Sequence, residues 1–294
     1  MELRRFGPDD LSRLVDLHNA ALAEEHEFIP YTDAKLQVEL NQATSIWIAT
    51  QHERVVGAAF HYPMWYGNEI VPFAAPDVDS RGILTELLDR IEADIDGEEA
   101  VIAVPAEERD RIAFLEARGY QVDGGMVQLI TDLHDARSIP ELPAGYSLRS
   151  LRRDEWSDFV AMVNTAYDAE RLSLNAFERW AEDARWREDW VQVVDVQGSL
   201  VATVVARPDR EFNEHFRAHR AYLGPAAVLP EHGKQGLGRA LTAAALNLVR
   251  SQGMDSASLY TTQSNTAVHR LTEQLGFWRA HRWDFMKKDI QGAR

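Results

Sequence analysis

Hydrophobic residues recur along this chain with the period of an amphipathic helix, and the same pattern occurs once in each half. In both halves, four largely apolar positions follow the spacing i, i+3, i+4, i+7, which marks one buried helix face. These positions are Leu11, Leu14, Val15 and His18 in the first half and Trp156, Phe159, Val160 and Val163 in the second. After each helical pattern come short runs rich in β-branched residues, which predict strands.

The two halves are copies of one unit, related by an offset that grows along the chain. Leu3 matches Leu148 at an offset of 145, Pro76 matches Pro230 at 154, and Gly119 matches Gly276 at 157. The second copy has therefore gained nine residues, within the charged segment 208–220, and three more in the loop after Pro230. A repeat of this length predicts two copies of an α+β unit rather than a solenoid. The expected link is 135–143, where two prolines disfavour a helix.

The second copy predicts an alternating series of strands and helices. We expect strands at 147–151, 190–196, 200–207, 220–229, 256–261 and 277–288, and helices at 154–167, 175–187, 238–251 and 265–275.

Composition excludes several classes of function. The chain of 294 residues has no cysteine, which excludes disulfides, a cysteine nucleophile and thiolate metal sites. Its net charge of −16 disfavours nucleic acid and anionic membranes as partners. The chain lacks an apolar run of membrane-spanning length and an apolar signal core near Met1, so we expect a cytoplasmic protein. The histidines lack metal-ligand spacing, so no metal is expected, and the oligomeric state stays open.

A glycine-spaced loop is the strongest candidate for binding chemistry. It runs from Pro230 to Leu241, follows the apolar run 226–229 and opens a helical pattern. Glycines let the backbone approach a ligand closely, and the free N–H groups at a helix start favour an anion. This order of strand, loop and helix therefore predicts a pyrophosphate site. A plain turn before a helix is the alternative interpretation.

The loop around Gly236 and Gly238, together with the later Asn265, Leu271 and Leu275-Gly276-Phe277, resembles the GCN5-related N-acetyltransferases (GNAT family). Two fused copies resemble its tandem members. The resemblance implies an α+β fold with two GNAT-like domains. Each would have a mixed, mostly antiparallel sheet, helices on both faces, and splayed fourth and fifth strands. We expect domains at 1–135 and 143–294, the second of which binds acetyl-coenzyme A (acetyl-CoA).

The resemblance also implies a mechanism and a set of site residues. The pantetheine arm would lie along the fourth strand, where a backbone N–H would polarise the thioester carbonyl. The pyrophosphate would lie on the amides of the loop, and an amine would attack the acetyl group directly. The implied cofactor-binding residues are Ala226, Ala227, Val228, Lys234, Gln235, Gly236, Leu237, Gly238, Arg239 and Asn265. Asn265 is also a good helix N-cap, and the two roles are compatible.

The catalytic positions depart from the family pattern. Many members have Arg or Gln at the position of Gly233, and many have a tyrosine acid in the last helix, where this chain has Thr272. Some tandem members carry a glutamate base on the fourth strand; counting back from Pro230, that position is Tyr222. Tyr222 and Tyr260 are therefore the candidate catalytic residues. Half-buried structural tyrosines are the alternative, because a phenol is a poor base at neutral pH.

Two further features bear on the substrate and on the first copy. The series Trp180, Trp186 and Trp190 predicts core packing, with an aromatic substrate wall as the alternative. In the first copy, Asp79, Arg81 and Glu108 occupy the positions of Gly236, Gly238 and Asn265. Acidic groups there repel a pyrophosphate, so we expect that the first domain does not bind coenzyme A.

The sequence therefore predicts an N-acetyltransferase whose C-terminal domain transfers an acetyl group from acetyl-CoA to a primary amine of a small molecule. Two alternatives stay open. The acceptor could be an amine of a peptide or protein, or the chain could be a non-enzymatic acyl-CoA-binding sensor or scaffold.

Overall fold

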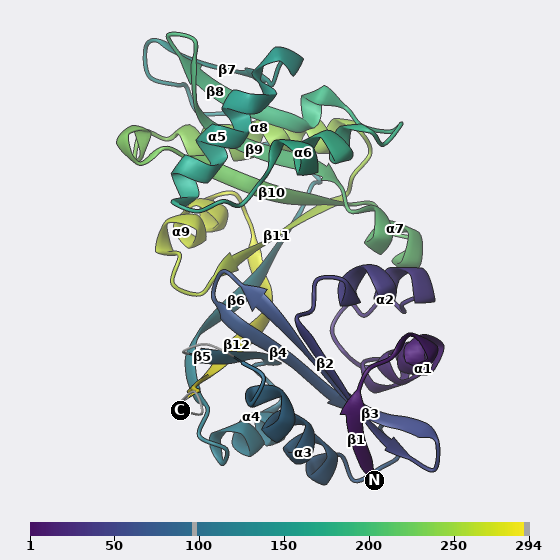
Figure 1. Cartoon of the computed structure of the whole chain (residues 1–294). Coiled ribbons are helices and arrows are strands. Elements are labelled where there is room, and N and C mark those ends of the chain that lie inside the picture. The colour runs from purple at the N-terminus through teal and green to yellow at the C-terminus, as the bar shows by residue number, and fades with distance from the viewer. Residues whose placement is uncertain (96–98, 291–294) are drawn as a thin grey trace. The chain divides into compact units, whose positions relative to one another are not determined.

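The computed structural model describes residues 1–95 and 99–290 and divides into two compact units (Figure 1). Unit 1 holds residues 1–126 and 262–264 and the described residues from His281 onward. Unit 2 holds residues 127–261 and 265–280. Each unit is described by itself below.

Unit 1 is a mixed sheet with helices on both faces. Its strands follow the order β1-β2-β3-β4-β5-β12. One face packs against α1 and α2 and the other against α3 and α4, each around its own apolar cluster. The elements are β1 (Glu2–Arg5), η1 (Pro8–Asp10), α1 (Leu11–Ala21), α2 (Asp33–Leu40), β2 (Ser45–Gln51), β3 (Arg54–Met64), β4 (Gly67–Ala74), α3 (Ser80–Glu92), β5 (Glu99–Pro105), α4 (Arg109–Glu116) and the start of β6 (Gln121–Asp132).

Unit 2 repeats this plan with the order β6-β11-β10-β9-β8-β7. Helices α5 and α6 cover one sheet face, and α8 and α9 cover the other. The elements are β7 (Tyr146–Ser150), η2 (Arg153–Glu155), α5 (Trp156–Tyr167), α6 (Leu174–Ala181), η3 (Glu188–Trp190), β8 (Val191–Val196), β9 (Ser199–Pro208), α7 (Arg210–Phe216), β10 (Arg220–Val228), η4 (Pro230–His232), α8 (Leu237–Ser251), β11 (Ser256–Thr262), α9 (Thr266–Gln274) and β12 (Trp278–Asp289), whose later part belongs to unit 1.

The predicted fold class is confirmed. Strand pairs are antiparallel except β4 with β5 and β10 with β11, among the pairings that the described residues define. In both parallel pairs the partners stay in register for only two or three residues and then part. The fourth and fifth strands are thus splayed in each unit. The predicted strand ends of the second copy lie within one residue of the observed ones.

One expectation for the second copy was wrong, and one helix was not predicted. The helix expected to reach 187 ends at Ala181, and a bend and the short η3 turn follow it. The nine-residue insertion folds as α7, a helix with no buried residue. Its lack of a buried face explains why hydrophobic periodicity did not reveal it.

The last strand of each sequence copy contributes to the core of the other unit. Val127 and Leu129 of β6, from the first copy, belong to the apolar cluster of unit 2 with α8. Met286 of β12, from the second copy, belongs to the cluster of unit 1 with α3. The domain limits 1–135 and 143–294 stay a prediction about the sequence copies, and the compact units combine segments of both. Residues 291–294 lie outside the described chain.

We predict that Leu129→Ala loosens unit 2 although Leu129 lies in the first sequence copy. Its side chain is 2% exposed, and removing a buried leucine costs about 2–5 kcal/mol. Native-state hydrogen exchange should show a larger loss of protection in α8 than in α3. Leu87→Ala, at a fully buried position of α3 in unit 1, should give the opposite pattern. A greater loss in α3 for Leu129→Ala would contradict the strand assignment.

Candidate functional site

The candidate site of unit 2 begins where β10 and β11 part. Their parallel pairing covers Arg220, Ala221 and Tyr222 of β10 and ends opposite Ser258. Beyond a bulge, β10 continues to pair with β9 as far as Val228. One backbone edge of β10 therefore faces an opening in the sheet rather than another strand. Groups on such an edge must find another hydrogen-bond partner, such as a ligand that binds as a strand does.

The register shows which predicted backbone groups face this opening. Leu229 N–H donates to Val201 C=O at 2.9 Å, so this pair lies in a hydrogen-bonded position. Because antiparallel pairs alternate, Ala227 also turns its N–H toward β9, while Ala226 and Val228 turn theirs toward the opening. Of the three residues predicted together, Ala227 is therefore directed away from the opening.

The start of α8 presents free backbone donors. Its first helical bond runs from Ala240 N–H to Gly236 C=O at 3.0 Å, so the preceding amides of Leu237, Gly238 and Arg239 have no partner within the helix. Gly236 has φ +83°, and a Cβ added there would meet no atom within 4 Å. A Cβ on Gly238 would lie 3.2 Å from Leu271 Cδ1 in α9. The exposed loop at Lys234 and Gln235 thus leads into an uncapped helix start, which fits an anionic phosphate.

The two positions in α9 have structural roles. The side chain of Asn265 accepts a hydrogen bond from Val268 N–H at 3.2 Å, so this residue caps the helix, as its alternative interpretation predicted. Thr272 is 1% exposed, and its hydroxyl donates to Val268 C=O at 2.8 Å. Thr272 therefore lies in the core and offers no acid to the opening.

Tyr222 lies at the edge of the opening, facing the α5–α6 side of the sheet. It is the last β10 residue paired with β11, and burial raises the pKa of its phenol above the ordinary value of 10. Its ring lies 6.3 Å from that of Tyr260, the other candidate. Tyr260 is 39% exposed, and its hydroxyl accepts a hydrogen bond from Gln128 at 3.1 Å. The structure thus brings both candidate tyrosines together.

Sequence reasoning missed Tyr167 and Arg207. Tyr167, at the end of α5, donates its hydroxyl to the carbonyl of Ala226 at 2.9 Å. Arg207 pairs opposite Tyr222, and its guanidinium lies 5.5 Å from the ring of Trp180 and 5.9 Å from that of Tyr222. A charge that closes the apolar run 200–206 was the one signal for Arg207 in the sequence.

The three tryptophans of the predicted series, at positions 180, 186 and 190, do not all have the same role. Trp190 is 4% exposed and donates its Nε1–H to Gln252 at 2.8 Å, which makes it a core residue. Trp186 packs edge-on against Trp190 and Phe177. Trp180 packs edge-on against Phe177 as well, and it also contacts Arg207 beside the opening. The core interpretation holds for Trp190, and Trp180 fits the aromatic-wall alternative.

The equivalent opening of unit 1 lacks the backbone donor. Pro72 pairs opposite Ala59 as Ala226 pairs opposite Val204, so Pro72 occupies the register position of Ala226 and has no N–H. The carbonyl of Pro72 accepts a hydrogen bond from Arg111 at 3.5 Å. Glu25 and Glu108 form ion pairs with Arg111. In unit 1, an arginine and two carboxylates therefore stand beside the strand edge that corresponds to the open edge of β10 in unit 2.

Unit 1 keeps a carboxylate where unit 2 has the tyrosine. Glu69 matches Tyr222 in its pairing with both neighbouring strands. Burial raises the pKa of Glu69, and its carboxylate accepts a hydrogen bond from the Tyr66 hydroxyl at 2.9 Å.

In the loop before α3, Asp77 is paired with Arg54 at 2.7 Å, and Asp79 precedes the helix without capping it.

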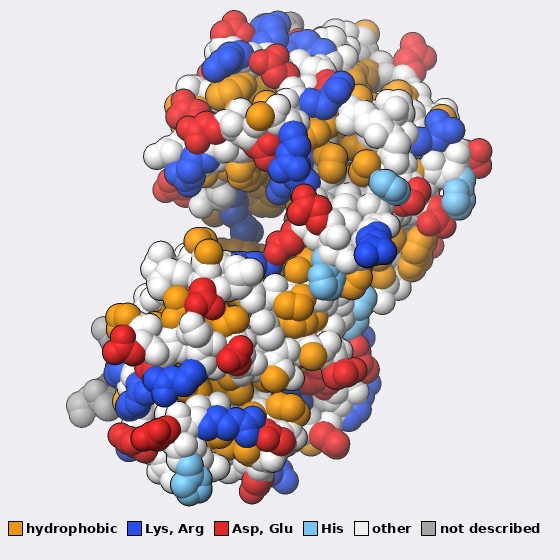
Figure 2. All heavy atoms as spheres, turned by 90° about the vertical axis from the view of Figure 1, so that its right-hand side faces the viewer, with side chains coloured by type: hydrophobic (Ala, Val, Ile, Leu, Met, Phe, Trp, Pro, Cys, Tyr) orange, Lys and Arg blue, Asp and Glu red, His pale blue; other side chains and the backbone are white. Residues whose placement is uncertain are grey.

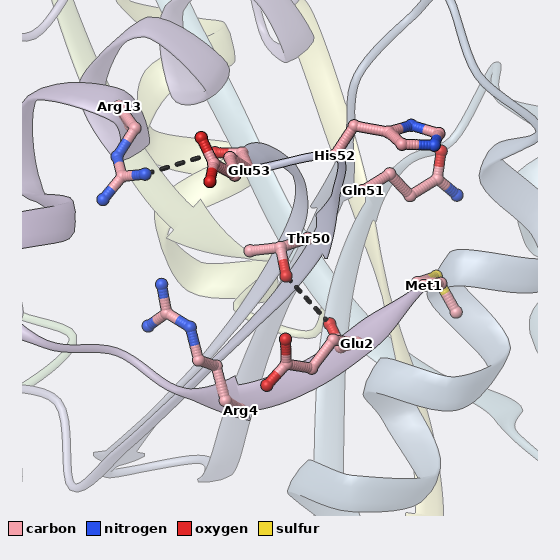
Figure 3. Close-up of a pocket in the computed structure, with 8 residues that line it drawn as sticks. All are labelled: Met1, Glu2, Arg4, Arg13, Thr50, Gln51, His52 and Glu53. Atoms are coloured by element: carbon pink, nitrogen blue, oxygen red, sulfur yellow. Dashed lines mark hydrogen bonds between the residues drawn. The ribbon is translucent and has the colours of Figure 1, made fainter.

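A separate hollow of about 760 Å³ lies on unit 1 and is lined by residues of β1, of the end of β2 with the turn that follows it, and by Arg13 of α1 (Figure 3). Arg13 donates to Glu53 C=O at 3.2 Å, and Thr50 donates to Glu2 C=O at 3.4 Å. Arg4 and Arg13 are also paired with Asp10. Both arginines of the hollow are thus engaged with neighbouring residues, and none of the predicted site residues lines it.

Charges of both signs are interspersed over the face drawn in Figure 2. Among residues 1–95 and 99–290, no group of three or more His, Asp or Glu is placed to hold a metal ion. No helix in the same described ranges has the length and apolar character needed to span a bilayer.

Comparisons with known proteins agree with this geometry. Residues 148–277 match the model of the acetyltransferase (GNAT) family. The chain is 27% identical over 294 residues to a mycothiol acetyltransferase of Kocuria rhizophila, covering 93% of each. It is 35% identical over 151 residues to a mycothiol acetyltransferase of Salinispora arenicola, covering 48% of each, so this match spans about half of that relative.

Solved structures show the same fold over nearly the whole chain. A GCN5-related N-acetyltransferase from Sphaerobacter thermophilus has a TM-score of 0.72 at 16% identity, covering 99% of this chain and 96% of the other. A tandem GNAT protein from the clavulanic acid biosynthesis pathway has a TM-score of 0.69 at 21% identity, covering 100% and 99%. The tandem arrangement is thus also found in a solved structure.

We predict that the Tyr222 phenol ionises above pH 10, because burial disfavours the tyrosinate. Tyr222→Phe should therefore remove a tyrosinate absorbance that develops only above that pH in the wild-type protein. Tyr146→Phe, which removes a tyrosine bonded to His232, serves as the control for the titration. Ionisation of Tyr222 below pH 10 would contradict the burial argument and restore the phenol as a candidate base.

Proposed function

We propose that this chain is an acetyl-CoA-dependent acyltransferase of the GNAT type, that unit 2, which contains most of the residues matched by the family model, carries the reaction, and that it acetylates a primary amine of a small molecule. The observation that carries this proposal is the opening between β10 and β11. It has free backbone donors on β10 at one side and the uncapped start of α8 beside it.

The residues of unit 2 fit the parts of acetyl-CoA. The pyrophosphate would accept hydrogen bonds from the amides of Leu237, Gly238 and Arg239 and lie over the open space at Gly236. The exposed cations of Lys234 and Arg239 add favourable charge. The pantetheine arm would pair with the free edge of β10, and Asn265 would border it from the start of α9.

The backbone N–H of Ala226 would stabilise the negative charge that develops on the thioester oxygen. Tyr167 supports this geometry, because its hydroxyl holds the carbonyl of the same residue. In the transfer, the amine nitrogen bonds to the acetyl carbon, the carbon–sulfur bond breaks, and coenzyme A leaves as a thiolate. The acceptor ammonium must lose one proton, and the thiolate must gain one.

We assign different roles in proton transfer to Tyr222 and Tyr260. With its pKa raised, Tyr222 stays protonated near neutral pH, so it serves as a hydrogen-bond donor or as the acid for the thiolate rather than as a base. Tyr260, more exposed and 6.3 Å away, can contact a proton-carrying water. Catalysis then depends mainly on positioning and on the backbone donor.

Unit 1 is proposed not to bind coenzyme A. Pro72 has no N–H at the position of Ala226, and Arg111 with its two carboxylate partners stands beside the edge. Asp77 and Asp79 stand where the pyrophosphate would lie. These features support a stoichiometry of one acetyl-CoA per chain.

We predict that Gly236→Glu weakens acetyl-CoA binding by about 100-fold or more, because like-charge contact costs several kcal/mol. Gly253→Glu is the matched control. Gly253 follows the other end of α8, has φ +90° and also has open space around its Cβ position. Isothermal titration calorimetry should give one site per chain for the wild type and for Gly253→Glu. Equal weakening by both variants, or two sites per chain, would contradict the proposal.

A further inference from the structure

Arg207 is a half-buried cation that forms no ion pair with any residue in the described ranges 1–95 and 99–290. Its Nε atom is buried and has no hydrogen-bond partner. Within the described part of the chain, its guanidinium forms ring contacts with Trp180 and Tyr222 but no ion pair. Arginine keeps its charge at every accessible pH, so a buried, unbonded N–H of this group is costly.

Neighbouring arginines of unit 2 have carboxylates. Arg220, at the start of β10, is paired with Asp209 at 2.9 Å. Arg210, three residues after Arg207, is paired with Asp183 and lies over the ring of Trp190. In unit 1 the register position of Arg207 holds Tyr62, which is opposite Glu69. The register position that holds the cation of Arg207 in unit 2 thus holds a tyrosine in unit 1.

Arg207 also lies where an acceptor would meet the thioester. It is directly opposite Tyr222, so the two side chains stand on the same sheet face, the one covered by α5 and α6. Tyr222 is the last residue before the strands part, and Ala226 lies a few residues further along the same strand. Contacts with aromatic rings do not use up the N–H donors of a guanidinium, which stay able to bind an anion.

We propose that Arg207 binds a carboxylate of the acceptor, so that the substrate is a small amine that also carries a carboxylate, such as an amino acid. This inference rests on the proposed function, because it assigns the acceptor side of the same site. Trp180 and Tyr222 hold the guanidinium in place, and its N–H fork binds the carboxylate with two parallel hydrogen bonds. Anchoring that end of the substrate directs the amine toward the acetyl group at Ala226.

A monoanionic carboxylate fits better than a phosphate dianion. Arg207 offers one guanidinium, and the neighbouring Arg210 and Arg220 are already paired with Asp183 and Asp209. The second negative charge of a phosphate dianion would therefore not be matched by a second free cation among these arginines. We therefore do not expect phosphate-bearing amines to be the substrate, and the experiment below includes them as a comparison.

The test uses the full chain and matched pairs of amines: amino acids, their decarboxylated amines, their carboxamides and phosphate-bearing amines. Transfer is followed by the release of the coenzyme A thiol, which is unambiguous because the protein has no cysteine. The wild type should prefer the amino acid over its decarboxylated partner by about 50-fold or more in kcat/KM. Arg207→Gln should abolish that preference, and Arg207→Lys should retain part of it, since a lysine keeps the charge without the fork.

Arg210→Gln is the matched control, because it removes a neighbouring ring-stacked arginine that already has a carboxylate partner. Its preference for amino acids should equal that of the wild type. Acetyl-CoA affinity, measured in each variant by calorimetry, should stay unchanged, which separates acceptor recognition from misfolding.

The outcomes separate this inference from the proposed function. Equal kcat/KM for amino acids and decarboxylated amines, a preference for phosphate-bearing amines, or a preference that survives Arg207→Gln overturns the carboxylate assignment and leaves the acetyl-CoA site intact. Binding of acetyl-CoA without transfer to any amino acid of the panel overturns it as well. Failure of the wild type to bind acetyl-CoA instead removes the proposed function itself.

Discussion

The site of this protein depends on one strand, β10, that keeps one neighbour and loses the other. Its antiparallel pairing with β9 extends to Val228, whereas its parallel pairing with β11 ends at Tyr222. Backbone donors in a sheet are normally satisfied by the next strand, so an edge held rigid on one side and open on the other is a preformed binding surface. The start of α8, the candidate tyrosines and Arg207 all lie around this edge.

The apolar core of each unit contains residues from both sequence copies. Leu129 of the first copy is buried with α8, and Met286 of the second copy is buried with α3. Removing either copy at the linker would therefore take a core strand from the remaining unit.

The opening between β4 and β5 in unit 1 and the opening between β10 and β11 in unit 2 differ at two matched positions. Unit 1 has the buried Glu69 at the register position of Tyr222, but Pro72 removes the N–H that Ala226 supplies in unit 2. Unit 1 thus has the carboxylate without the backbone donor at these two positions, and unit 2 has the donor without the carboxylate. In unit 2, the phenol of Tyr222 and the cation of Arg207 replace the carboxylate of Glu69 and the phenol of Tyr62, which changes this face of the opening from an acidic to a basic one.

The sequence alone determined the tandem α+β plan, the strand ends of the second copy and the position of the glycine loop, because hydrophobic periodicity and glycine spacing are local properties of the chain. It could not reveal α7, which buries no residue, or the end of α6 at Ala181. Tertiary structure decided which of Ala226, Ala227 and Val228 face the opening, because that depends on the register with β9. It also decided in which unit each part of the closing strands is buried, and that Arg207 stands opposite Tyr222. Pairing partners are set by residues far away in sequence, which no local pattern records.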